Sequence, residues 1–235
     1  LQRKMKPKMK NLLAVDTSTE NCSVALQWQN TFLSEAIESP REHSQRLLPF
    51  VEKVLQQAET NLNQLDGLVV GVGPGSFTGV RIGVSMAQGL AFSSELPVFP
   101  VSSLQALAQQ AIRKHGAEAV VACIDARMGE IYYGLYRSKN GVAEAITEPA
   151  VAVPSADLFS EHDLQGFYTA GTGWDNYSDV LDPNKKLKYS NDCRLPLAED
   201  MLTVAVKGEV SAVSAEHLEP LYVRNEVTWK KLPGR

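Results

Sequence analysis

Residues 71–83, GVGPGSFTGVRIG, constrain the fold of this chain more than any other stretch. They lie between the apolar run 68–70 and a run with helical periodicity, 84–92. Glycine enters positive φ freely and lets another backbone segment approach closely, so this composition predicts a strand, a tight turn and a helix. The stretch has no lysine and fits neither G-x-x-x-x-G-K-[ST] nor G-x-G-x-x-G, which argues against a phosphate-binding loop.

Small residues recur every four positions along the predicted helix. After Thr78, the expected N-cap, they are Gly79, Gly83, Ala87 and Ala91. Such a stripe lets another element pack at close range. Two interpretations stay open at this point, because the stripe can pack inside its own domain or against a helix of a partner. The apolar run is too short to span a membrane.

The charge distribution argues against a primary nucleic-acid binder. The net charge is −4, and residues 1–10 carry five positive charges and no negative one, so the rest of the chain has a net charge of −9. Phosphate neutralisation needs a basic face, which this remainder does not offer. Residues 1–10 lack the apolar segment of a secretory signal, and we expect them to form a disordered basic extension ahead of the fold.

Cysteine and histidine usage indicates a cytoplasmic chain without a metal site. An odd number of widely spaced cysteines, with no C-x-x-C, fits a reducing compartment better than a disulfide scaffold. The histidines show neither H-x-x-x-H nor H-E-x-x-H spacing, so the sequence predicts no metal ligands. The residues concerned are Cys22, Cys123, Cys193, His43, His115, His162 and His217.

Strand and helix patterns alternate along the chain, which predicts an α/β fold. No low-complexity linker divides the chain, and we expect an N-terminal half over residues 11–102 and a C-terminal half over 103–235, whose last residues can pack back on the first half. The strands are expected at 11–15, 22–28, 66–70, 97–101, 119–124 and 167–170, and the helices at 39–58, with a kink or late start at Pro49, then 78–92, 103–112, 155–159 and 199–206.

Two hairpins share one pattern. Residues 13–26 align without a gap with residues 122–135. In each, an apolar strand ends at an aspartate (Asp16 or Asp125), a polar turn follows, and a second strand ends in a small residue and leucine. Any strand-turn-strand unit shares part of this pattern, but a gapless match at both ends favours a duplication.

Two hairpins with an aspartate at the mouth resemble the skeleton of the actin/Hsp70/sugar-kinase (ASKHA) superfamily, in which such turns hold nucleotide phosphates. The chain is more specifically similar to the TsaB (YeaZ) family from about residue 11 to residue 231. This resemblance implies an α/β fold of two similar ASKHA-like halves in tandem. It is carried by VDTSTENCSVAL (15–26), REHSQRLLP (41–49), GVGPGSFTGVRIGV (71–84), IDARMGEIY (124–132) and PLYVRNEVTWKK (220–231).

The resemblance implies a non-catalytic subunit of the machinery that places N6-threonylcarbamoyl on the adenosine next to the anticodon, in tRNAs reading codons that begin with A. In that system TsaC makes threonylcarbamoyl-adenylate, TsaD transfers the group to tRNA, and the ATPase TsaE resets the complex. The implied partners are TsaD and TsaE, with tRNA reached only through the complex and a homodimer when the chain is alone. No cofactor is implied.

The family's contact with TsaD is a four-helix bundle to which each protein gives two helices. In this chain they are the predicted helices around residues 43–58 and 78–92, and the expected contacts are His43, Leu47, Leu48, Val51, Gly79, Arg81, Gly83, Met86 and Ala87. The superfamily's phosphate loops fall on Asp16, Thr17, Ser18, Asp125 and Arg127. We expect these positions to be vestigial, because the Cβ of Ser18 would crowd a phosphate.

Two enzymatic alternatives compete with the subunit role. An ATP-dependent small-molecule kinase of the superfamily would use Asp16 as a metal ligand or base, whereas Asp16 can equally well only cap its own turn. A peptidase would need Ser85 on a sharp turn, but the near match to G-x-S-x-G at residues 83–87 falls inside a helical pattern. We expect no catalytic residue, since transfer from an acyl-adenylate needs a polarising centre such as a metal.

Overall fold

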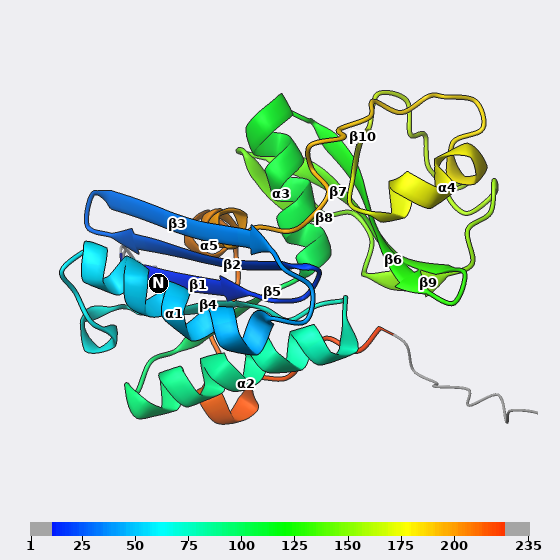
Figure 1. The fold of residues 1–235 in the computed structure, drawn as a ribbon. Helices are drawn as coiled ribbons and strands as arrows, with labels where there is room; N and C mark the ends of the chain where they lie inside the picture. The colour runs from blue at the N-terminus through cyan, green and yellow to red at the C-terminus, as the bar shows by residue number, and fades with distance from the viewer. Residues whose placement is uncertain (1–10, 224–235) are drawn as a thin grey trace, which may run out of the picture.

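The computed structural model describes residues 11–223. The predicted basic extension 1–10 and the end of the family segment 220–231 therefore lie outside the described residues. The first half contains a five-stranded sheet in the order β3-β2-β1-β4-β5, in which β1–β3 are antiparallel neighbours and β4 and β5 run parallel to β1 (Figure 1). Its strands are β1 (Leu12–Asp16), β2 (Asn21–Trp28), β3 (Thr31–Glu38), β4 (Gly67–Gly71) and β5 (Val98–Val101).

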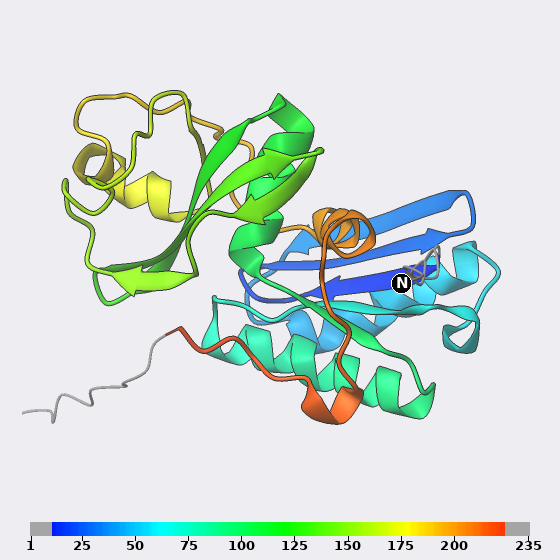
Figure 2. The ribbon, with the colours of Figure 1, turned by 180° about the vertical axis from the view of Figure 1, so that it is seen from behind.

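Helices cover both faces of this sheet, α1 (His43–Gln57) and α2 (Phe77–Ser93) on one side and α5 (Ala198–Lys207) on the other (Figures 1 and 2). Side chains alternate across a strand, so Leu13 and Val15 pack under α1 and α2 whereas Leu12 and Ala14 pack under α5. No helix among residues 11–223 is long and apolar enough to cross a membrane.

The second half holds another sheet, with the order β10-β6-β7-β8 and with β9 paired to β7. Helix α3 packs on one face of this sheet and α4 on the other. Helices α3 and α5 also pack against each other between the two sheets (Figure 2). The elements are α3 (Ser103–His115), β6 (Ala119–Arg127), β7 (Glu130–Lys139), β8 (Val142–Ala145), β9 (Ala150–Ala152), β10 (Tyr168–Ala170) and α4 (Gly173–Leu181), with short 3-10 turns at Leu62–Gln64 and Ala215–His217.

The two sheets repeat one topology. The run β8-β7-β6-β10 has the same order and the same strand senses as β3-β2-β1-β4. This confirms the predicted class, an α/β fold with two similarly built sheets in tandem. The hairpins differ in register by one residue, because Leu26 pairs with Leu13 whereas the aligned Leu135 pairs with Val121 across a bulge after Asp125.

Several predicted bounds of helices were wrong, and some elements were not predicted. The N-cap of α2 is Ser76, whose side chain accepts from the Gly79 amide, and the predicted cap Thr78 lies inside the helix. Helix α1 starts late, at His43, and continues through Pro49. Residues 155–159 form turns instead of a helix, and β3 and α4 were not predicted.

Residues 213–223 return to the first half. Val213 pairs with Val98 at the edge of the first sheet, the Leu221 amide donates to the Val72 carbonyl at 2.8 Å, and the Gln88 side chain of α2 donates to the Leu218 carbonyl at 2.9 Å. The last described segment is thus packed along α2, as Figure 2 shows. The division of the chain at residue 102 itself stays a prediction.

Candidate functional site

A cleft of about 960 Å³ lies between the two halves. The β1–β2 turn and the first residues of α1 and α2 form one wall, and the β6–β7 turn and the start of α4 form the other. Residues 220–223 also line the cleft. In the superfamily that the chain resembles, the two turns with an aspartate at the mouth hold nucleotide phosphates. The contacts of these two turns therefore bear on what the cleft can hold.

The start of α2 fills the first turn. The Ser76 amide donates to the Ser18 carbonyl at 2.7 Å, and Thr17 Oγ1 donates to the Gly79 carbonyl at 2.7 Å. A Cβ built on Gly75 or Gly79 would overlap the carbonyl oxygens of Ser18 and Thr17 respectively. The helix therefore packs directly on the turn, and only glycine permits this approach.

The small-residue stripe is consequently occupied inside its own half. A Cβ on Gly83 would lie 2.7 Å from Thr17 Oγ1, and Gly79, Gly83 and Ala87 are all buried. In this structure the β1–β2 turn lies against Gly79 and Gly83, and Ala87 faces the core of the same half, while the predicted role of these residues in a partner contact stays a prediction. Of the two interpretations left open by the sequence, packing within the domain describes the stripe.

Asp16 lies beneath this turn and does not face the cleft. It is fully buried, its Oδ1 accepts from the Ser18 amide at 3.2 Å, and its Oδ2 has no hydrogen-bond partner among residues 11–223. Burial raises the pKa of Asp16 to about 7 because it disfavours the charged carboxylate. Ser18 turns inward as well, its Oγ bonding to Ser103 Oγ at 2.7 Å. Neither Asp16 nor Ser18 therefore lines the cleft.

The second turn is open to the cleft but its charges are paired. Asp125 Oδ1 accepts from the Arg127 amide at 2.8 Å, and the Asp125 amide donates to Thr172 Oγ1 at 3.2 Å. Arg127 Nη2 reaches across the cleft to Glu20 Oε1 at 2.9 Å, although its side chain is 73 % exposed. The Arg127 guanidinium thus links the two turns, and the charged neighbours that it contacts are both carboxylates.

The expected partner contacts separate into buried and accessible residues. His43, Leu47 and Val51 of α1 are buried, and His43 lines the cleft at the start of the helix. Burial lowers the pKa of His43. Leu48 is 38 % exposed, and Arg81 and Met86 are partly exposed. Leu48, Arg81 and Met86 are thus the accessible residues among the nine predicted contacts.

Three exposed aromatic side chains near α2 were missed by sequence reasoning. Phe77 is 70 % exposed at the start of the helix and Phe92 is 69 % exposed at its end. Arg81 stacks on the Phe77 ring at 3.4 Å from its centroid and donates to the hydroxyl of the third, Tyr222, at 2.8 Å, which fastens the last described segment to α2. Helical periodicity places an aromatic residue on a face, but it does not say that a face remains uncovered.

Comparisons with known proteins found a matching family model, similar sequences and a similar solved structure. Residues 31–221 match the family described as "TsaD: tRNA N6-adenosine threonylcarbamoyltransferase". The tRNA threonylcarbamoyladenosine biosynthesis protein TsaB of Escherichia coli is 46% identical over 229 residues, covering 95% of this chain and 99% of the relative. TsaB of Haemophilus influenzae is 42% identical over 241 residues, covering 95% of this chain and 98% of the relative. The structure of YeaZ from Pseudomonas aeruginosa matches with a TM-score of 0.83 and 42% identity, over 91% of this chain and 100% of that one.

Proposed function

Because this chain belongs to the TsaB (YeaZ) family, we propose that it serves in the biosynthesis of threonylcarbamoyladenosine in tRNA as a non-catalytic subunit that pairs with TsaD. The family is established by the identity over nearly the whole chain. We propose four further points: that the role is non-catalytic, that the partners are TsaD and TsaE, that tRNA is contacted only through the complex, and that the protein is cytoplasmic. Three free buried cysteines support a reducing compartment.

The closed first turn is the observation that carries the non-catalytic assignment. A kinase of this fold would need Asp16 beside a nucleotide, whereas Asp16 is fully buried under a turn that α2 covers. The peptidase alternative has no support either, since Ser85 lies within α2 and not on an elbow turn. In this proposal the chain supplies no catalytic group.

The proposed contact with TsaD is the outer surface of α1 and α2. Leu48 on α1 and the partly exposed Met86 on α2 offer apolar side chains for such a contact. The same surface would support a symmetric homodimer when TsaD is absent. Gly79, Gly83 and Ala87 contribute indirectly, by fixing α2 in place under this surface.

The test is tRNA threonylcarbamoylation by TsaC, TsaD and TsaE with and without this chain, repeated with Leu48→Asp. We expect product only with the intact chain, and a loss of at least tenfold with Leu48→Asp, because a carboxylate at the centre of an apolar contact is left unpaired. Val180→Asp is the matched control, since Val180 is 44% exposed on α4, outside α1 and α2.

Two results would contradict the proposal. Equal product without the chain would exclude the subunit role. Full activity of Leu48→Asp, with complex formation unchanged in size-exclusion chromatography, would exclude the α1 and α2 surface while leaving the role itself intact. Circular dichroism of both variants shows whether a loss arises from unfolding.

A further inference from the structure

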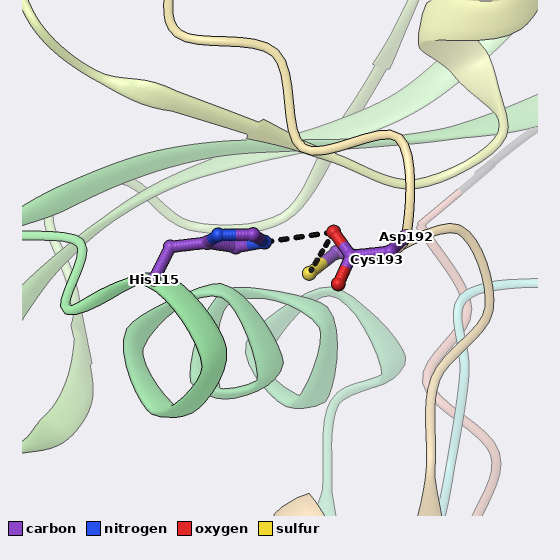
Figure 3. A group of neighbouring side chains, drawn as sticks. All are labelled: His115, Asp192 and Cys193. Carbon is purple, nitrogen blue, oxygen red and sulfur yellow. Dashed lines mark hydrogen bonds and ion pairs between the residues drawn. The ribbon is translucent and has the colours of Figure 1, made fainter.

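A histidine, an aspartate and a cysteine meet at the end of α3, away from the cleft. His115 is the last residue of α3, and Asp192 and Cys193 lie in the segment between α4 and α5 (Figure 3). The His115 Nε2 to Asp192 Oδ1 distance is 2.7 Å, and the Cys193 Sγ to Asp192 Oδ1 distance is 3.8 Å. All three donor atoms lie within 4.8 Å of one another.

Surrounding contacts already hold these donors in place. The His115 ring stacks on Tyr168 at a centroid distance of 5.8 Å. Lys114 Nζ donates to the Asp192 carbonyl at 2.8 Å and lies 3.4 Å from Asp192 Oδ2, which leaves Oδ1 directed at His115 and Cys193. The Cys193 carbonyl accepts from the Gly171 amide at 2.7 Å, so the loop is fixed to the end of β10.

We propose that His115, Asp192 and Cys193 form a binding site for one Zn²⁺ ion, with water as the fourth ligand. Imidazole nitrogen, thiolate sulfur and carboxylate oxygen are the ligands that Zn²⁺ takes, and three protein ligands plus water complete a tetrahedron. Tetrahedral zinc sets such donors roughly 3.3–3.6 Å apart. The His115 and Asp192 side chains are partly exposed, so they can open from their hydrogen bond to this spacing, and water can reach the fourth position.

Proton balance is simple for this site. The Cys193 thiol releases one proton to solvent as the sulfur–zinc bond forms. His115 binds through Nε2 in the tautomer that keeps its proton on Nδ1, and the ionised Asp192 gives up its hydrogen bond to His115 for a bond to the metal. Lys114 stays on Oδ2 as the outer contact that orients the carboxylate, as groups around metal ligands commonly do.

A bound ion would tie α3 to the segment that leads into α5. These two helices pack together between the sheets, so the ion would fix the junction of the halves. None of the three ligands belongs to α1 or α2. The inference therefore stands apart from the proposed pairing with TsaD, and its failure would not affect that proposal.

The test uses the full chain, freed of metal and titrated with Co²⁺ as a spectroscopic substitute for Zn²⁺. We expect one Co²⁺ per chain, with a sulfur-to-cobalt charge-transfer band and tetrahedral visible bands that Zn²⁺ abolishes by displacement. Both Cys193→Ala and His115→Gln should lose the charge-transfer band or weaken binding at least tenfold. Cys123→Ala is the matched control, because Cys123 is also a free, fully buried cysteine in the second half.

Retention of the band in Cys193→Ala, or its absence in the wild-type chain, would overturn the site. His115→Gln keeps the test decisive if Cys193→Ala fails to fold, since His115 lies partly exposed at a helix end. A second measurement is the melting temperature, which Zn²⁺ should raise in the wild-type chain and in Cys123→Ala but not in His115→Gln. An equal rise in His115→Gln would also reject the proposal.

Discussion

At the scale of single residues, glycine sets how closely α2 lies against the first turn. A side chain at Gly75 or Gly79 would overlap backbone carbonyl oxygens, which cannot move aside as the end of a flexible side chain can. Gly89 differs, because nothing lies within 4 Å of a Cβ built on it. A side chain at Gly79 would therefore clash with the backbone, whereas there is room for a side chain at Gly89 of the same helix.

We expect Gly79→Ala to lower the free energy of unfolding by about 1–3 kcal/mol or more, since the added methyl group forces α2 away from Thr17. Gly89→Ala should instead raise it by up to about 1 kcal/mol, because alanine favours a helix over glycine. Urea unfolding of both variants checks this pair. Equal effects at the two positions would show that α2 does not rest on the turn.

The buried carboxyl of Asp16 should make stability depend on pH. Its pKa is about 7 in the folded chain, against 3.8 for an ordinary exposed aspartate, so the folded state binds the proton more tightly. This contribution is fully present below pH 3.8 and is lost as the pH rises through 7, and it amounts to roughly 4 kcal/mol at most. In Asp16→Asn the free energy of unfolding should fall less between about pH 4 and pH 7 than in the wild-type chain.

The measurement is the free energy of unfolding from about pH 4 to pH 9 for the wild-type chain and Asp16→Asn. The difference between the two curves isolates Asp16 from the other titrating groups. Asp157→Asn, at an exposed turn, is the control and should follow the wild-type curve. A constant difference between wild type and Asp16→Asn across this range would mean that Asp16 is ionised throughout.

At the scale of helices and strands, α3 and α5 are joined by an ion pair. Arg113 Nε and Nη2 donate to the two oxygens of Asp200 at 2.8 and 2.9 Å, and Arg113 also pairs with Glu199. Asp200 is fully buried, whereas the Arg113 side chain is 39% exposed. The two partners therefore have unequal access to water once the other is removed.

We expect Arg113→Ala to destabilise the chain by at least about 1–3 kcal/mol, because it leaves a buried carboxylate without its donors. Asp200→Asn should cost less than about 1 kcal/mol, since the guanidinium can be hydrated and still pairs with Glu199. Chemical unfolding of the two single variants tests the asymmetry. A larger loss of unfolding free energy in Asp200→Asn than in Arg113→Ala would contradict this expectation.

Elements with strong apolar patterns were predictable, and elements defined by contacts were not. Strands β1, β4 and β6 are apolar on both faces because helices cover both, and the sequence shows them clearly. Strand β3 is mostly exposed, so it has no apolar run to detect. Helix α4 is short, and its buried residues lie at its two ends, Gly173 and Trp174 at one and Leu181 at the other. Its sequence therefore shows no repeating apolar pattern from which a helix could be predicted.

At the scale of the whole molecule, the tandem fold and the family followed from the two hairpins and the glycine stretch. The site did not follow to the same degree. That Asp16, Thr17 and Ser18 are vestigial was predicted from the Cβ of Ser18 and stays a prediction, whereas the close packing of the start of α2 on this turn was not predicted. In the group formed by His115, Asp192 and Cys193, the histidine lies 77 positions before the adjacent Asp192 and Cys193, so no local spacing rule could indicate it.

The closed turn leads to a prediction on nucleotide binding. We expect MgATP to leave the melting temperature of the isolated chain unchanged, and that of Ser18→Gly unchanged as well, because the start of α2 still occupies the turn. Thermal unfolding of both chains with and without MgATP is the measurement. A rise of the melting temperature in Ser18→Gly alone would show that the Ser18 side chain, and not α2, excludes the nucleotide.

Residues 198–223 complete the first half, since α5 covers one face of its sheet and residues 213–223 lie along α2. Synthesis proceeds at about 5–20 residues per second, so the first hundred residues wait on the order of ten seconds for these partners. During that interval the α5 face of the first sheet stays uncovered. The α5 face of the first sheet is thus the surface that a chaperone at the ribosome would meet.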